Sequence, residues 1–311
     1  MALLIEIGQS GWITNAELRA ELMPLMPGQD VWISLDEGDP AEITMLATSR
    51  LPDDLPAKLP NLQLVQKLGA GVETIVNHPA LGPDVRVARL KPKLPAQEIA
   101  EYCLAYVLRG QRNMARHEDS QKRSSWDPVE PKQAARTTVG VLGLGHIGGL
   151  TARLMASLDF NVLGWSRSQK EMEGITCLSG EDGLKELLGQ SDYVCAILPS
   201  TTETRALMDS TRLRQMKPGA TLINCGRGDL VNEADLMGAL DAGAPAAAVL
   251  DVVSQEPLPE DHPLWRHPKV TITPHVSGWH LGDALNDVAA NYLRLTQGAG
   301  LLHEVDRGKG Y

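Results

Sequence analysis

Three polar residues that could take part in catalysis follow three successive strand-like segments of the sequence. Arg227 lies in the glycine-flanked loop NCGRG, Glu256 in the segment DVVSQEP, and His275 in the triplet TPH. Taken singly, an arginine ahead of a helix is more often a surface ion-pair residue, and a lone histidine is a weak signal. Because ligands of doubly wound folds bind at the carboxyl ends of the strands, the shared position of the three residues makes them candidates for one active site.

A glycine-rich turn earlier in the sequence predicts a dinucleotide-binding site. The sequence GLGHIG at 143–148 follows a predicted strand and opens a predicted helix. Its first glycine permits the tight turn, its second lets the backbone approach a pyrophosphate, and its third allows close packing of the helix, whose N-terminal N–H groups face the anion. The motif alone could be an ordinary turn, but five further strand candidates follow it and favour a cofactor. The candidate contacts are Gly143, Gly145, His146, Ile147 and Gly148.

The end of the next predicted strand indicates NADPH as the preferred cofactor, with NADH as the alternative. An acidic residue there would bind the ribose hydroxyls of NAD and repel a 2′-phosphate, but the sequence at 166–170 is SRSQK. An arginine supplies the charge-assisted contacts that a 2′-phosphate requires. A solvated polar loop is the alternative interpretation. The candidate phosphate contacts are Ser166, Arg167, Ser168 and Lys170.

These residues must be positioned by a parallel sheet that carries helices on both faces. From 138 to 274 the sequence alternates short aliphatic strand candidates with helix candidates, which is typical of a doubly wound α/β domain. The predicted strands cover 138–142, 161–165, 192–198, 220–224, 247–252 and 270–273. The predicted helices between them include 147–158, 183–188, 210–216 and 233–242. We therefore predict a Rossmann-like domain with a six-stranded doubly wound parallel sheet.

A smaller and proline-richer α/β unit precedes this region. Its strand candidates cover 3–7, 31–34, 43–47 and 64–67. The run PKLP at 92–95 is expected to break the structure before a helix at 97–108, which we interpret as a crossing between domains, and a last helix at 283–296 as the crossing back. The predicted domains are a flavodoxin-like substrate (catalytic) domain of residues 1–94 and 283–311 and a dinucleotide-binding domain of residues 95–282.

Composition and charge narrow the classes of partner. The formal net charge of -10 argues against nucleic acid and anionic membranes, because binding to them needs clustered Lys and Arg. The apolar stretches fall short of the ~20 residues that span a bilayer, and Glu6 interrupts the start where a signal peptide would continue. Cys103, Cys177, Cys195 and Cys225 form no CxxC pair, so neither a metal site nor a redox motif is indicated. We therefore expect a cytoplasmic protein with buried, reduced thiols.

The order of Arg227, then Glu256, then His275 is where the sequence resembles the D-2-hydroxyacid dehydrogenase family. The resemblance covers nearly the whole chain. Further matching segments are LGAGVETI at 68–75, AE at 100–101 in the crossing helix, and LPSTTET at 198–204. The segments that are similar to the glyoxylate/hydroxypyruvate reductase branch of the family are WSRS at 165–168, PLWRHPKVTITPH at 263–275 and the ending VDRGKGY at 305–311.

The resemblance implies an NADPH-preferring reduction of small 2-keto acids, such as glyoxylate to glycolate and hydroxypyruvate to D-glycerate, by hydride transfer. Arg227 is expected to bind the substrate carboxylate and to polarise the keto oxygen. The residues whose backbone N–H groups are expected to hold the other carboxylate oxygen are Ala70, Gly71 and Val72. His275 is the expected proton donor for reduction. Glu256 is expected to hold the tautomer of His275 and to favour the protonated imidazole. Loss of Glu256 should therefore move the pH profile of reduction to lower pH.

The resemblance also implies further contacts, a partner and some open alternatives. The further cofactor contacts are Leu198, Pro199, Thr204, Cys225, Gly226 and Asp251, the last with a turn role as the alternative. A homodimer is implied, with the polar segment 112–131 as a candidate arm. Departures from the family at 91–95 and at Trp279 leave the shape of the substrate entrance open. Other 2-hydroxyacid specificities, for phosphoglycerate or a larger 2-keto acid, and a dinucleotide-sensing binding module stay as alternatives.

Overall fold

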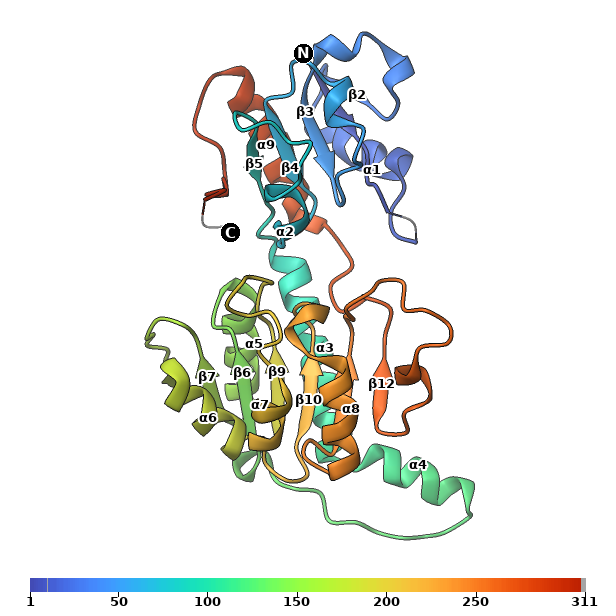
Figure 1. The fold of residues 1–311 in the computed structure, drawn as a ribbon, viewed down its shortest axis with the longest axis vertical. Coiled ribbons are helices and arrows are strands. Elements are labelled where there is room, and N and C mark those ends of the chain that lie inside the picture. The colour runs from blue at the N-terminus through green and yellow to red at the C-terminus, as the bar shows by residue number, and fades with distance from the viewer. Residues whose placement is uncertain (10, 309–311) are drawn as a thin grey trace. The chain divides into compact units, whose positions relative to one another are not determined.

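The computed structural model describes residues 1–9 and 11–308 and divides the chain into two compact units. Unit 1 comprises residues 1–94 and the chain from His280 onward, and unit 2 comprises residues 95–279 (Figure 1). The second boundary lies at 279/280, slightly before the predicted 282/283. Residues 309–311 of the segment VDRGKGY lie outside the described residues.

Within the described part of the chain, every helix falls short of the length or the apolar character that a membrane span requires.

Unit 1 is built on a parallel sheet with strands at both sides of β1. Its strands are β1 (Ala2–Ile5), β2 (Asp30–Trp32), β3 (Ile43–Thr48), β4 (Leu64–Lys67) and β5 (Arg86–Ala88). The order β2-β1-β3-β4-β5 is the flavodoxin-like order, which confirms the predicted fold class. The edge strand β5 is missing from the prediction because three residues, one of them an arginine, give no recognisable periodicity.

Helices cover both faces of this sheet. The helices of unit 1 are α1 (Asn15–Leu22), α2 (Glu73–Val76) and α9 (Leu285–Thr296), with 3₁₀ turns η1 (Met23–Leu25), η2 (Leu35–Glu37), η3 (Pro40–Glu42), η4 (Pro56–Lys58) and η8 (Gly282–Ala284). Leu3 and Ile5 pack with α1 and α9, whereas Leu4 between them packs with α2, as the alternation along a strand requires. Buried Asn291 anchors α9 to β4 through a 2.8 Å hydrogen bond to the Gln66 side chain.

Unit 2 contains a parallel sheet in the Rossmann order. Its strands are β6 (Thr138–Leu142), β7 (Asn161–Trp165), β8 (Thr176–Leu178), β9 (Tyr193–Ala196), β10 (Thr221–Asn224), β11 (Ala247–Leu250) and β12 (Val270–Ile272). In the order β12-β11-β10-β9-β6-β7-β8, the strand sequence reverses between β6 and β9, which is where such sheets bind dinucleotides. The predicted six strands are present, but their number is corrected to seven by β8. Its three residues at the sheet edge are only partly buried or exposed, so they lack the aliphatic run of a central strand.

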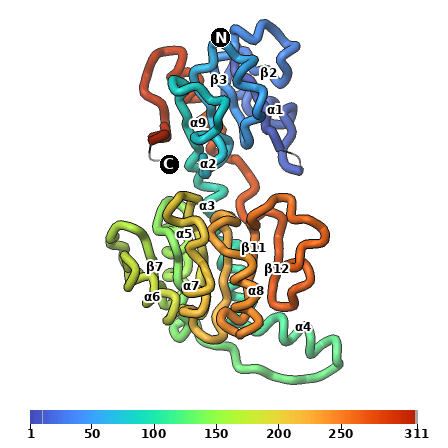
Figure 2. Tube along the Cα trace, in the orientation of Figure 1, coloured from blue at the N-terminus to red at the C-terminus, as the bar shows by residue number. Residues whose placement is uncertain are grey.

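Helices lie on both faces of the seven-stranded sheet. The helices of this region are α3 (Lys93–Gln111), α4 (Met114–Lys122), α5 (His146–Ala156), α6 (Gly180–Gln190), α7 (Ser210–Gln215) and α8 (Glu233–Ala242), with 3₁₀ turns η5 (Ala134–Arg136), η6 (Gly228–Leu230) and η7 (Pro263–Arg266). Val139 and Val141 of β6 pack with α3 and α5, whereas Leu142 packs with α6, α7 and α8. Figure 2 traces this double winding, with α7 and α8 in front of the strands.

The crossing helix α3 begins earlier than predicted. It starts at Lys93 rather than at residue 97, and Pro95 lies inside its first turn. Because the N–H groups of a first helical turn have no partner within the helix, a proline there removes no hydrogen bond. The expectation that the run 92–95 interrupts the structure ahead of the helix is therefore wrong.

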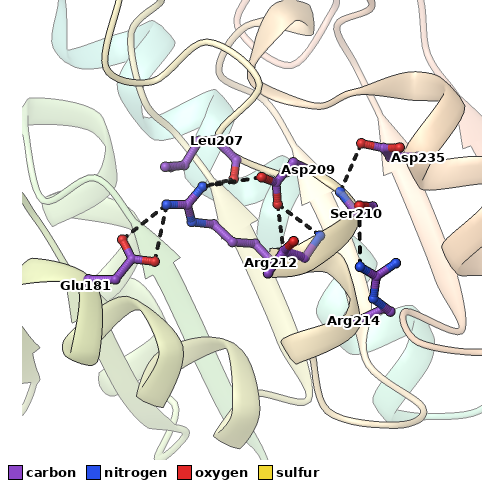
Figure 3. Close-up of polar contacts among 8 residues, drawn as sticks. Glu181, Leu207, Asp209, Ser210, Arg212, Arg214 and Asp235 are labelled. Carbon is purple, nitrogen blue, oxygen red and sulfur yellow. Dashed lines mark hydrogen bonds and ion pairs between the residues drawn. The ribbon is translucent and has the colours of Figure 1, made fainter.

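A polar network fixes the front layer of unit 2 around the start of α7 (Figure 3). Asp209 is the N-cap of α7 and accepts a 2.9 Å hydrogen bond from the backbone N–H of Arg212. The Arg212 guanidinium contacts both carboxylate oxygens of Glu181 on α6, at 3.2 and 3.1 Å. The N–H of Ser210 donates to Asp235 on α8 at 2.9 Å. One turn of helix is thus tied to its neighbours on both sides.

Candidate active site

The structure brings His275 and Glu256 together after two neighbouring strands. His275 Nδ1 lies 2.7 Å from Glu256 Oε2, while Glu256 Oε1 accepts a 3.1 Å hydrogen bond from the N–H of Val253. The pair uses Nδ1 of the imidazole, so Nε2 is the ring atom that can exchange a proton with a ligand. The histidine side chain is 52% exposed and the glutamate 38%, so a small molecule can reach the pair.

Glu256 is held in its charged form. Burial acts to raise the pKa of Glu256, but the hydrogen bond and charge of His275, the N–H of Val253 and the charge of Arg227 outweigh it. The net pKa of Glu256 lies below its ordinary value of 4.5. Glu256 is therefore a charged acceptor for Nδ1 of His275.

The backbone around His275 is constrained by Asp251. His275 has a φ of 55°, in the left-handed region, which costs a residue other than glycine about 1–3 kcal/mol and therefore persists only where the surroundings fix it. The backbone N–H of His275 donates to the Asp251 carbonyl at 2.9 Å. The Asp251 carboxylate accepts from the N–H groups of Val276 and Ser277, both at 2.9 Å. Asp251, predicted as a cofactor contact or a turn residue, here makes the contacts of a turn residue.

The Arg227 loop leaves the carboxyl end of β10 and packs against the Glu256 loop. The Asn224 side chain closes the loop by donating to the Arg227 carbonyl at 2.9 Å and accepting from the N–H of Gly226 at 3.1 Å. A Cβ on Gly228 would lie 2.0 Å from the carbonyl carbon and oxygen of Val253, so the two loops approach each other as closely as only glycine allows. Arg227 and Glu256 are thereby placed on adjoining loops.

Two positioning residues of this edge escaped the sequence analysis. Asn224 closes the Arg227 loop, and Glu233, the first residue of α8, accepts a 2.7 Å hydrogen bond from the N–H of Ser254 in the Glu256 loop. Both are polar residues in or beside the glycine-flanked Arg227 loop, and this position in the sequence could have identified them as candidates. Their partners depend on side-chain directions that a sequence pattern does not determine.

The glycine turn has the geometry that a pyrophosphate needs. Gly143 has a φ of 100°, and a Cβ on it would lie 2.6 Å from the Ile197 carbonyl oxygen. A Cβ on Gly148 would lie 1.8 Å from the Gly143 carbonyl oxygen, so α5 packs directly on the turn. A Cβ on Gly145, the N-cap of α5, would meet no atom within 4 Å of the described structure, which leaves open space in front of the helix N-terminus at His146 and Ile147. The turn therefore fits a dinucleotide.

In the loop after β7, the predicted phosphate contacts make hydrogen bonds to other groups of the protein. Ser166 donates from its hydroxyl to the Ser168 carbonyl at 2.8 Å. Arg167 Nη1 donates to Glu203 Oε2 at 2.8 Å, and both side chains are largely exposed. Lys170 Nζ donates to the Leu144 carbonyl at 2.6 Å and so braces the glycine turn. Of the predicted phosphate contacts, Arg167 thus pairs with the carboxylate of another loop.

The loop after β9 lies against the Arg227 loop. The Thr204 hydroxyl donates to the Pro199 carbonyl at 2.6 Å and accepts from the N–H of Thr201, so it closes the loop on itself. A Cβ on Gly226 would lie 2.8 Å from the Leu198 carbonyl oxygen. The predicted contacts of this region therefore share one edge of the sheet with the glycine turn.

The four cysteines are free thiols. Three of them, Cys103, Cys195 and Cys225, are buried, whereas Cys177 in β8 is half-buried. The Sγ atoms of Cys103 and Cys225 lie 3.8 Å apart. The contact with Cys195 acts to lower the pKa of the Cys103 thiol, but the contact with Cys225 and burial outweigh it and raise that pKa. Cys225, predicted as a cofactor contact, therefore packs against α3.

The predicted carboxylate loop belongs to unit 1, after β4. Gly69 has a φ of 154°, and its carbonyl accepts a 2.9 Å hydrogen bond from the N–H of Leu90. Val72 is the N-cap residue of α2. Ala70 and Gly71 form the turn between these two anchors, at the carboxyl end of the unit 1 sheet.

Lys67 is a cation beside this loop that the sequence analysis did not single out. It is the last residue of β4, and its ammonium donates to the Ser49 carbonyl and to the Ser49 hydroxyl, the latter at 3.2 Å. A phosphorylated substrate would need cations near this loop, and Arg50 follows β3 at the same sheet edge. Lys67 adds a second one at the same sheet edge.

Comparison with known proteins agrees with this geometry. The profile of the D-isomer specific 2-hydroxyacid dehydrogenase NAD-binding domain matches residues 104–277, more than half of the chain. The glyoxylate/hydroxypyruvate reductase A of Serratia proteamaculans is 36% identical over 309 residues, which cover 96% of each chain.

Solved structures give the same result. A D-isomer specific 2-hydroxyacid dehydrogenase from Xanthobacter autotrophicus Py2, in complex with NADPH and MES, superposes with a TM-score of 0.92 at 38% identity, covering 100% of this chain and 99% of the other. An NADPH-dependent glyoxylate/hydroxypyruvate reductase from Sinorhizobium meliloti, in complex with NADP and sulfate, has a TM-score of 0.91 at 30% identity, with the same coverage. The chain thus belongs to the D-isomer specific 2-hydroxyacid dehydrogenase family.

Proposed function

We propose that this chain is an NADPH-preferring reductase of small 2-keto acids, converting glyoxylate to glycolate and hydroxypyruvate to D-glycerate. The observation that carries the proposal is the His275–Glu256 pair on a loop that packs against the Arg227 loop, at the edge that also holds the glycine turn. The names of the relatives add support, since two are glyoxylate/hydroxypyruvate reductases and the Xanthobacter structure contains NADPH.

The residues around the glycine turn fit the cofactor. When bound, NADPH supplies the hydride that reduces the keto carbon. The open space at Gly145 and the N–H groups at the start of α5 would accept the pyrophosphate. Arg167 would exchange its bond to Glu203 for one to the 2′-phosphate. Ser166, Ser168 and Lys170 stay proposed contacts of the same loop.

Arg227 is proposed to bind the substrate. Its guanidinium offers two parallel N–H donors to the carboxylate and places a positive charge where the keto oxygen becomes negative. The N–H groups of Ala70, Gly71 and Val72 are the proposed donors to the remaining carboxylate oxygen. Their role rests on the turn geometry within unit 1.

His275 is proposed to complete the reduction. As the hydride adds to the keto carbon, the developing alkoxide takes a proton from Nε2 of the imidazolium, which becomes a neutral imidazole. Glu256 holds Nδ1 protonated throughout, stabilises the imidazolium before the reaction and keeps the ring in one orientation. Solvent then reprotonates Nε2 for the next turnover.

Initial rates of reduction test this function. With purified protein, we expect oxidation of NADPH on addition of glyoxylate or hydroxypyruvate, a higher kcat/KM with NADPH than with NADH, and D-glycerate as the product by chiral chromatography. Turnover confined to phosphorylated or larger 2-keto acids would instead support the alternative specificities. NADPH binding without turnover on any 2-keto acid would favour a binding module.

We also propose that the chain forms a homodimer through the segment 112–131. Within unit 2, α4 and the stretch that follows it extend away from the sheet (Figure 1). Trp126 on this stretch is 98% exposed, and tryptophan is a residue that interfaces tend to bury. Light scattering should give a mass near twice 33.6 kDa, and Trp126→Ser should lower it. A monomeric mass for the unmodified protein would contradict the proposal.

We propose that the protein works in the cytoplasm. Its four cysteines are free, and a reducing compartment keeps thiols in this state. Fractionation of cells that make the native chain should place its reductase activity with the cytosolic marker. Recovery in a secreted or membrane fraction would contradict this localisation.

A further inference from the structure

A chain of hydrogen bonds links helix α3 to the loop of the catalytic histidine. The Tyr102 hydroxyl lies 2.6 Å from Thr273 Oγ1, which donates to Asp251 Oδ1 at 2.6 Å. The same carboxylate accepts the backbone N–H groups of Val276 and Ser277, which directly follow His275. These hydrogen bonds therefore reach the residues on both sides of His275.

The donor in each of these hydrogen bonds follows from the number of protons that the groups carry. Thr273 has one hydroxyl proton and gives it to Asp251, so Tyr102 must be the donor to Thr273. Burial raises the pKa of Tyr102 far above its ordinary value, with the hydrogen bond to Thr273 acting in the opposite direction. The tyrosine therefore remains a protonated donor over the whole range of pH in which the enzyme is expected to work.

The last acceptor of these hydrogen bonds is the buried carboxyl group of Asp251. Asp251 is 2% exposed, and a carboxylate away from water must have its lone pairs occupied by fixed donors. These donors orient the carboxylate, and the carboxylate in turn holds a backbone that has a φ of 55° at His275. A weaker donor set would let this turn relax and displace the imidazole.

We propose that Tyr102 is a positioning residue for His275, which acts through Thr273 and Asp251. The inference rests on the proposed role of His275 as proton donor and extends that site to the crossing helix. Its neighbour Cys103 also contacts Cys225 of the Arg227 loop, so two consecutive residues of α3 contact two catalytic loops. Removal of the Tyr102 hydroxyl should lower the rate of the chemical step without weakening cofactor binding.

Tyr102→Phe tests the proposal, with Tyr106→Phe as its matched control. Tyr106 lies one helical turn later, and its ring centroid is 4.8 Å from that of Tyr102. We expect Tyr102→Phe to lower kcat for glyoxylate reduction about 3- to 10-fold, the range of one neutral hydrogen bond. The dissociation constant of NADPH should stay unchanged, and Tyr106→Phe should match the unmodified protein. An unchanged kcat for Tyr102→Phe would overturn the proposal.

A double-mutant cycle with Thr273 separates positioning from ordinary packing. Thr273→Val removes the link to Asp251 and should lower kcat more than Tyr102→Phe does, whereas Thr273→Ser keeps the hydroxyl and should keep kcat. Because the two residues act in series, Tyr102→Phe should have no further effect in the Thr273→Val background. Additive losses would contradict the serial chain. If Tyr102→Phe does not fold, the comparison of Thr273→Ser with Thr273→Val still decides, because equal kcat values overturn the proposal.

The rates of His275→Asn and Tyr102→Phe distinguish an error in the role of Tyr102 from an error in the proposed function. If His275→Asn reduces glyoxylate at the unmodified rate, the assignment of the proton donor is wrong and the inference falls with it. If His275→Asn is inactive while Tyr102→Phe keeps full kcat, only the positioning role of Tyr102 is overturned.

Discussion

Arg167 donates a 2.8 Å hydrogen bond to Glu203, and this ion pair joins the loop after β7 to the loop after β9. Both side chains are more than 60% exposed, so the pair itself adds little to stability. In the account proposed here, NADPH presents a 2′-phosphate to the same guanidinium. The glutamate and the phosphate then compete for one cation.

Replacement of Arg167 should change the cofactor preference. Because a charge-assisted hydrogen bond to the 2′-phosphate is lost, Arg167→Ala should raise the KM for NADPH about 10- to 100-fold and leave the KM for NADH nearly unchanged. Steady-state kinetics with both cofactors measures this. Arg116→Ala, in the Arg116–Asp127 pair of the α4 arm, controls for the loss of one positive charge. Equal changes with NADPH and NADH would rule out a 2′-phosphate contact at Arg167.

Neutralising Glu203 should have the opposite effect. Glu203→Gln removes a carboxylate that attracts Arg167 and repels the phosphate, so the KM for NADPH should fall about 2- to 5-fold. The KM for NADH should stay the same, because that cofactor carries no 2′-phosphate. An increase in the KM for NADPH would mean that Glu203 instead holds Arg167 ready for the cofactor.

The Glu256 carboxylate should set the upper pH limit of reduction. Its pKa lies below the ordinary value, so it stays ionised over the whole range in which an imidazole titrates and favours the imidazolium. For Glu256→Gln we expect kcat at neutral pH to fall about tenfold or more. The pH above which reduction declines should move to lower values. Profiles of kcat against pH check this, with Glu260→Gln of the same segment as the control, and a profile of unchanged position would contradict it.

The sequence predicts the inner strands of the two sheets well but misses one short edge strand in each sheet. The observed β6 and β7 have the predicted residues because both are inner strands of a parallel sheet whose middle residues are buried. By contrast, β5 and β8 are three-residue edge strands, which are too short to have a periodicity. The start of α3 is misjudged because Pro95 signals a break in sequence but is harmless in a first helical turn.

For the site, the sequence predicts positions but not partners. The meeting of His275 with Glu256 follows from the parallel order of their strands. The strand order does not predict the hydrogen bond of Lys170 to the Leu144 carbonyl. It also does not predict the burial of Asp251 under the His275 loop. These contacts depend on side-chain directions within irregular loops, which packing against distant segments decides.

A partly buried carboxylate directly before β9 should make stability depend on pH. Asp192 accepts from Lys132 Nζ and Lys217 Nζ, both at 2.7 Å, and from the N–H of Thr138 at 2.8 Å. Burial acts to raise the pKa of Asp192, but these three donors outweigh it and lower the pKa below its ordinary value of 3.8. Its contribution is therefore complete above the unfolded pKa and is lost as the pH falls through the lower, folded pKa.

Asp192→Asn should accordingly lower the free energy of unfolding by about 1–3 kcal/mol at pH 7, the range of a hydrogen bond to a charged group. Urea unfolding of both proteins between neutral pH and pH values below 3.8 measures the difference, which should shrink as the acid protonates Asp192. Asp209→Asn, which changes the exposed cap of α7, serves as a comparison. A difference that is independent of pH would show that the charge of Asp192 contributes nothing.

The most direct test of the account is the rate of glyoxylate reduction by His275→Asn at saturating NADPH. A general acid typically contributes 10²–10⁴-fold, so kcat should fall by about three orders of magnitude. The dissociation constant of NADPH and the thermal midpoint should remain those of the unmodified protein, and His117→Asn on α4 should be fully active. A His275→Asn variant that retains kcat within about threefold would contradict the assignment of His275 as the proton donor.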